Sequence, residues 1–206
     1  MNNTTLAQDL LSQLQGAPMQ QLASQLGTTP QQTTSAVGAA LPLLLGTLGR
    51  NASQPQGAQA LFGALQKDHA GMDLGSVLGA VLGGGGGQQQ NPIAAAGPAI
   101  LGHIFGGNQP RAQQGLGQAT GLDSSQATQL LAMLAPIVLS FLANRSKQQG
   151  LDAGSLGQAL GQERNQIEQQ GGMGGLLGAV LDQDGDGQLG IGDLMKLGGD
   201  FLGGKR

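Results

Sequence analysis

Apolar residues recur at intervals of three and four positions along most of the chain. In the first such segment Leu6, Leu10 and Leu14 share one stripe, and Met19 and Leu22 begin the next. This spacing gathers apolar side chains on one face of an α-helix. Similar segments occupy residues 61–65, 74–81, 93–105, 130–142, 156–160 and 176–181. Because no stretch alternates with a period of two over a useful length, the pattern predicts an all-α fold, a compact helical bundle.

Several local signals occur twice, about 94 to 99 residues apart. Residues 29–32 and 123–126 both read as the start of a helix, with a capping residue followed three positions later by glutamine. Pro42 and Pro136 each lie thirteen residues after the cap, inside an apolar run. We therefore expect two similar helical halves, each with a kink or break at its proline. The tetrapeptide at residues 79–82 also recurs at residues 178–181.

A stretch rich in glycine and glutamine separates the two halves. Residues 83–87 are all glycine, and residues 88–90 are all glutamine. Such a composition is typical of a flexible linker. The expected domain organisation is a first helical repeat (residues 1–82), a linker (83–92), a second helical repeat (93–170) and a C-terminal segment (171–206).

The most specific signal for chemistry lies at residues 182–193. A twelve-residue loop that binds a hard cation needs oxygen ligands at positions 1, 3, 5 and 12, a backbone carbonyl at position 7 and glycine at position 6. Gly187 provides the sharp turn at position 6. The pattern resembles an EF-hand helix-loop-helix over residues 175–201. The expected metal ligands are Asp182, Asp184, Asp186 and Asp193 through their carboxylates, and Gln188 through its backbone carbonyl.

The expected ion is Ca²⁺, with Mg²⁺ as a competitor. Position 12 is Asp193 instead of glutamate, and the shorter side chain reaches less easily for the bidentate seat that suits the larger Ca²⁺. In the first half, the stretch after Leu82 corresponds to this loop but has no carboxylate in residues 83–90. The sequence therefore predicts one cation site per chain.

Residues that could carry catalysis have simpler structural explanations. Ser124 and Ser125 lie at a helix start, where capping accounts for them. His103 lies in an apolar segment and is expected to pack in the core. Glu163 and Glu168 lie in a glutamine-rich segment that we expect to be solvated. We therefore expect that the chain is not an enzyme.

The amino-acid composition limits the kinds of partner that the protein can bind, and the first residues bear on its location in the cell. Only 10% of the residues are charged and the net charge is -3, which leaves no basic surface for nucleic acid. The chain has no cysteine, so disulfides and thiolate metal sites are excluded. Its first residues lack the basic and apolar regions of a signal peptide, and we expect a cytoplasmic location.

Two apolar runs, residues 36–49 and 130–143, leave an alternative function open. Each contains a proline and is shorter than the roughly 20 residues that cross a bilayer. We expect buried core helices without membrane contact. The alternative is a membrane-associating or self-assembling helical protein that uses these proline-broken helices, because small residues favour close helix association.

Three segments, residues 99–106, 118–122 and 130–136, together resemble the bacterial "domain of unknown function 937" family. The similarity spans roughly residues 5–160 and is clearest over residues 97–147. The resemblance implies a bacterial, helical protein without catalytic features, and it carries no activity onto particular residues. Together with the predicted cation loop, this resemblance leads to a hypothesis about function. In this hypothesis, the protein binds a divalent cation and serves as a structural or interaction module with an unidentified protein partner.

Overall fold

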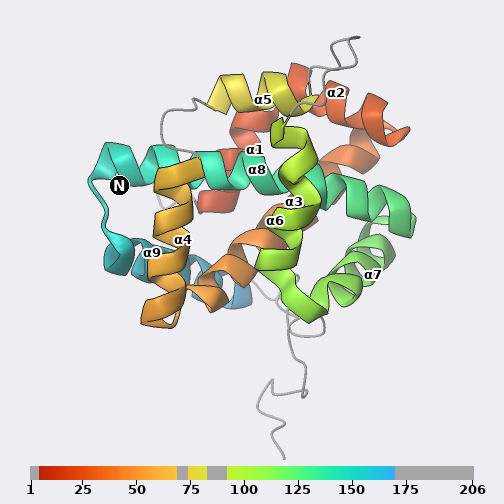
Figure 1. Ribbon diagram of the computed structural model, residues 1–206. Coiled ribbons are helices and arrows are strands. Elements are labelled where there is room, and N and C mark those ends of the chain that lie inside the picture. The colour runs from red at the N-terminus through yellow and green to blue at the C-terminus, as the bar shows by residue number, and fades with distance from the viewer. Residues whose placement is uncertain (1–4, 69–73, 83–91, 170–206) are drawn as a thin grey trace, which may run out of the picture.

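The computed structural model describes residues 5–68, 74–82 and 92–169 (Figure 1). Every regular element within them is helical, so the all-α prediction is confirmed for this part of the chain. The elements in chain order are α1 (Leu6–Leu14), α2 (Ala17–Leu26), α3 (Pro30–Asn51), α4 (Pro55–Asp68), α5 (Leu74–Leu82), α6 (Pro92–Phe105), the 3₁₀-helix η1 (Gly106–Asn108), α7 (Gln109–Thr120), α8 (Ser124–Gln149) and α9 (Ala153–Gln169).

Two long helices, α3 and α8, cross in the middle of the fold and pack against each other (Figure 1). Helices α1, α2, α6, α7 and α9 pack on α3, whereas α2, α4, α5, α6 and α7 pack on α8. Side chains on all sides of both long helices are buried, and Leu44 and Leu134 are fully enclosed. A helix that is apolar all round needs such neighbours. The two apolar runs of the sequence are therefore core helices, as expected.

The N-terminus of each long helix is capped by the residue that the sequence predicted. The hydroxyl of Thr29 accepts a hydrogen bond from the N–H of Gln32 at 3.2 Å, and the carboxylate of Asp123 accepts one from the N–H of Gln126 at 2.8 Å. Gln126 also accepts from the N–H of Asp123, which completes a capping box. The preceding helices, α2 and α7, both end at a glycine in the left-handed region, Gly27 (φ 66°) and Gly121 (φ 71°).

Pro42 and Pro136 lie inside α3 and α8, and neither helix is interrupted there. A break at either proline is therefore wrong, and the alternative expectation of a kink stays a prediction. Proline has no N–H, so each helix loses the hydrogen bond to the carbonyl four residues earlier, at a cost of about 3 kcal/mol. Both helices are enclosed by others, and this packing holds the backbone helical despite the loss.

The carbonyl that loses its helical hydrogen bond at Pro136 belongs to Ala132, and this carbonyl lies against helix α6. A Cβ atom added to Gly97 of α6 would collide with the Ala132 oxygen and lie 3.0 Å from its carbonyl carbon. At this point α6 and α8 meet backbone to backbone, which only glycine permits. Gly49 of α3 approaches α9 in a similar way, because an added Cβ would lie 2.7 Å from the Leu160 oxygen.

Helix α8 is the one helix in the described residues that is long and apolar enough to cross a membrane. This differs from the expectation that both apolar runs are too short, because α8 extends beyond residues 130–143 at both ends. However, 72% of its most apolar 18-residue window is buried inside the fold. A core helix with such neighbours passes the same test of length and composition.

Candidate functional site

The predicted metal ligands lie outside the described residues, and the cation site remains a prediction from the sequence. They are Asp182, Asp184, Asp186, Gln188 and Asp193. Among the residues that the structure describes, no group of three or more His, Asp or Glu side chains could hold a metal ion. The polar side chains in the described residues instead form hydrogen bonds and an ion pair between distant parts of the chain.

Glu163 of α9 is buried, with only 5% of its surface exposed. Its two carboxylate oxygens accept hydrogen bonds from the backbone N–H groups of Leu6, at 2.8 Å, and Ala7, at 3.0 Å. The first N–H groups of a helix have no partner within the helix, and the helix dipole favours a negative charge there. The expectation that Glu163 is solvated is therefore wrong. Its partners are 156 and 157 residues away in sequence, so the local glutamine-rich composition gave no sign of them.

A second charged contact also joins α1 to the C-terminal part of the fold. Arg145 of α8 donates from Nη1 to Oδ2 of Asp9 at 2.7 Å. The two side chains are 34% and 27% exposed, respectively, so solvent screens much of the attraction. This ion pair orients α1 on the fold and contributes less to stability than the buried contact of Glu163.

Two glutamine side chains each satisfy a carbonyl at the end of a distant helix. Nε2 of Gln32 donates to the Gly121 oxygen at 3.1 Å, and Nε2 of Gln126 donates to the Leu26 oxygen at 3.0 Å. The carbonyl of Gly121, which caps α7, and the last carbonyl of α2 thereby gain partners that their own helices cannot supply. The sequence shows a glutamine three residues after each cap, which predicted a capping role but not the second contact.

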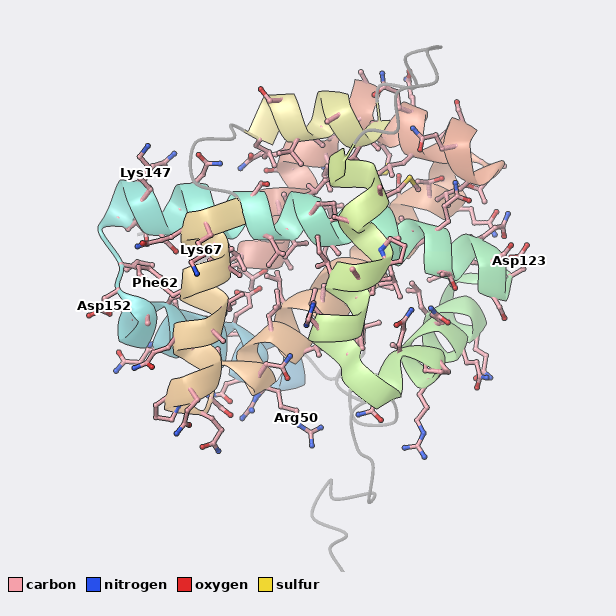
Figure 2. All side chains as sticks on the ribbon, in the orientation of Figure 1. Arg50, Phe62, Lys67, Asp123, Lys147 and Asp152 are labelled. Carbon is pink, nitrogen blue, oxygen red and sulfur yellow. The ribbon has the colours of Figure 1, made fainter. Side chains whose placement is uncertain are left out.

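Two exposed aspartates serve as helix caps. The backbone N–H of Gln126 and then the hydroxyl of Ser125 lower the pKa of Asp123 below its ordinary value of 3.8. The backbone N–H and the hydroxyl of Ser155 lower the pKa of Asp152 in the same way. Asp123 and Asp152 lie near opposite ends of α8, far apart in Figure 2, so they cannot act as an acid–base pair on one substrate bond.

His103 of α6 is exposed, and the prediction of a packed core histidine is wrong. Its neighbours Leu101 and Ile104 are buried, and the helical period then places position 103 on the outer face. The other histidine, His69, lies outside the described residues.

Residues 8–145 match a family described as "Bacterial protein of unknown function (DUF937)". The match extends from α1 almost to the end of α8 and covers more than half of the chain. The chain belongs to this family. The DUF937 match ends before α9 and before residues 182–193, so it does not include the predicted cation loop. No curated protein and no solved structure matches the chain.

Proposed function

We propose that this DUF937 protein binds one divalent cation, Ca²⁺ or Mg²⁺, through residues 182–193 and serves as a non-enzymatic structural or interaction module. The observation that carries the proposal is the order of residues in the loop. Aspartates stand at positions 1, 3, 5 and 12, and glycine stands at position 6. Oxygen ligands at this spacing suit a hard cation.

The charges of the loop explain why a cation would stabilise it. Asp182, Asp184, Asp186 and Asp193 carry four negative charges, and bringing them within coordination distance of one point is unfavourable without a counter-charge. A divalent ion removes that repulsion. Binding is then expected to stabilise residues 175–201. This segment follows α9, which holds the start of α1 through Glu163.

We also propose that the helical part consists of two similar halves joined by residues 83–91, one residue fewer than the sequence suggested because Pro92 is the first residue of α6. In support, a left-handed glycine, a capping residue and a proline within the following helix recur 94 residues apart. The order of helices supports the same view, because α1 to α4 and α6 to α9 both run as two shorter helices, a long central helix and a fourth helix. The matching positions are Gly27 and Gly121, Thr29 and Asp123, and Pro42 and Pro136.

Thermal unfolding with and without divalent ions tests the proposed function. Since a ligand that binds only the folded state stabilises it by mass action, free ion at ten times Kd is expected to add about 1.4 kcal/mol. For a chain of this size that corresponds to a rise in Tm of about 3–6 °C. The chain with Asp182→Ala and Asp186→Ala should show no rise, because both changes remove ligands.

A matched control is Asp123→Asn, which alters an exposed carboxylate far from the loop in sequence and leaves a side chain that still caps a helix. Its Tm should rise with added ion as much as that of the wild type. Equal rises in the wild type and the double variant would show that the ions act elsewhere, and the absence of any rise would count against the site.

A further inference from the structure

Two of the polar contacts that join distant parts of the fold have a counterpart that starts 94 residues further along the chain. We call residues 5–82 the N-terminal half and residues 92–169 the C-terminal half. Gln32 of the N-terminal half bonds the end of α7, and Gln126 of the C-terminal half bonds the end of α2. The two glutamines are 94 residues apart. Each half thus makes a similar contact to the other, although the acceptors differ by one position, because Gly121 corresponds to Gly27 and not to Leu26.

A second pair of contacts also starts from positions 94 residues apart, although the two contacts differ in chemistry. Near the end of α3, Nδ2 of Asn51 donates to the Ile104 oxygen of α6 at 2.8 Å. At the position 94 residues later, Nη1 of Arg145 bonds Asp9 of α1 at 2.7 Å. Each long helix therefore contacts the first helix of the opposite half. This approximate reciprocity resembles the arrangement at a self-complementary, two-fold interface.

The apolar core is shared between the halves in the same manner. Helix α3 packs on α6, α7, α8 and α9, all from the C-terminal half, and α8 packs on α2, α3, α4 and α5 from the N-terminal half. The fourth helices, α4 and α9, also pack on each other. Gly49 of α3 and Gly157 of α9 both approach backbone of the opposite half, at Leu160 and Ala52. Neither half encloses its own long helix.

We propose that a second copy of the chain can supply the opposite half, so that two copies exchange their C-terminal halves and form a closed dimer. Every contact between the halves described above would then form between copies. Exchange of identical elements is a low-cost route to a dimer because it needs no new contacts. This proposal does not depend on cation binding.

Chain concentration decides which form prevails. If residues 83–91 act as the linker proposed above, the two halves of one chain have an effective concentration on the order of 1 mM for each other. Copies that fold in dilute solution therefore pair within the chain. Copies that unfold and refold together at about 1 mM should form exchanged dimers in comparable amounts.

Two single-cysteine copies detect the exchange, because the chain has no cysteine of its own. One copy carries Asp9→Cys and the other Arg145→Cys, which replace the partners of the ion pair. The two are mixed, unfolded in guanidinium, refolded at about 1 mM and treated with a short bismaleimide. Exchange brings Cys side chains of different copies together, so a covalently cross-linked dimer is expected. The same mixture, treated with the bismaleimide without prior unfolding, should give little cross-linked dimer.

A second pair of cysteine variants keeps the test valid if the variants at positions 9 and 145 fail to fold. Nε2 of Gln129 donates to the backbone carbonyl oxygen of Gln25 at 3.3 Å across the halves. Because the two positions lie this close, Gln25→Cys and Gln129→Cys in separate copies should cross-link in the same way. The control carries Arg145→Cys in both copies, which exchange does not bring together. The inference is overturned if refolded, helical copies give no cross-linked dimer with either pair, or if the control cross-links equally well.

Discussion

Replacing Glu163 with alanine is expected to lower the free energy of unfolding by about 2–5 kcal/mol. The substitution leaves the N–H groups of Leu6 and Ala7 without their acceptor, and each unsatisfied buried group costs about 1–3 kcal/mol. It also removes the negative charge at the positive end of α1 and leaves a void at a residue that is only 5% exposed. Denaturant unfolding followed by circular dichroism measures the loss.

Two further variants separate this contact from general effects on α9. Glu163→Gln keeps one acceptor oxygen, so its loss of stability should lie between those of the wild type and Glu163→Ala. Gln162→Ala changes an exposed neighbour on the same helix and should alter stability by no more than about 0.5 kcal/mol. If Glu163→Ala and Gln162→Ala were equally stable, the carboxylate would not be the anchor of α1.

Replacing Gly97 with alanine is expected to destabilise the fold by about 1–3 kcal/mol, although alanine is the better helix former. The added methyl group would collide with the carbonyl of Ala132. That atom belongs to the backbone of α8, a core helix, so relief requires α6 and α8 to move apart. Denaturant unfolding followed by circular dichroism measures the change in the free energy of unfolding.

Gly102 on the same helix provides the matched control. It has no heavy atom within 4 Å of an added Cβ and does not have a positive φ. Gly102→Ala should therefore stabilise the protein by up to about 1 kcal/mol through helix propensity alone. Opposite signs at positions 97 and 102 are expected, and a stabilising Gly97→Ala would contradict the close contact between α6 and α8.

The sequence predicted the features of the fold that depend on local pattern. Apolar spacing predicted helices, and the caps at Thr29 and Asp123 were placed correctly because the capping side chain bonds an N–H three residues away. The burial of α3 and α8 followed from their apolar runs. The effect of the prolines was not predictable in this way, because it depends on how many neighbouring helices enclose α3 and α8.

The features that the sequence missed depend on contacts between distant residues. Glu163 looks solvated among glutamines, yet its partners lie at the other end of the chain. His103 looks buried among apolar residues, but the rotation of α6 on its neighbours places it outside. The second role of Gln126 also requires the end of α2 to be near. None of these contacts can be predicted from the spacing of apolar residues. That spacing shows which residues share a face of a helix, but not which other helix that face packs against.

Isothermal titration calorimetry on the full chain tests the proposed cation site most directly. Titration with Ca²⁺ should give one binding event per chain, weaker than the roughly 10⁻⁷–10⁻⁵ M of EF-hand sensors because Asp193 is shorter than glutamate. Prior addition of Mg²⁺ should reduce the Ca²⁺ heat, and the chain with Asp182→Ala and Asp186→Ala should give none. If the wild type binds neither ion, or the double variant binds as the wild type does, residues 182–193 are not a cation site.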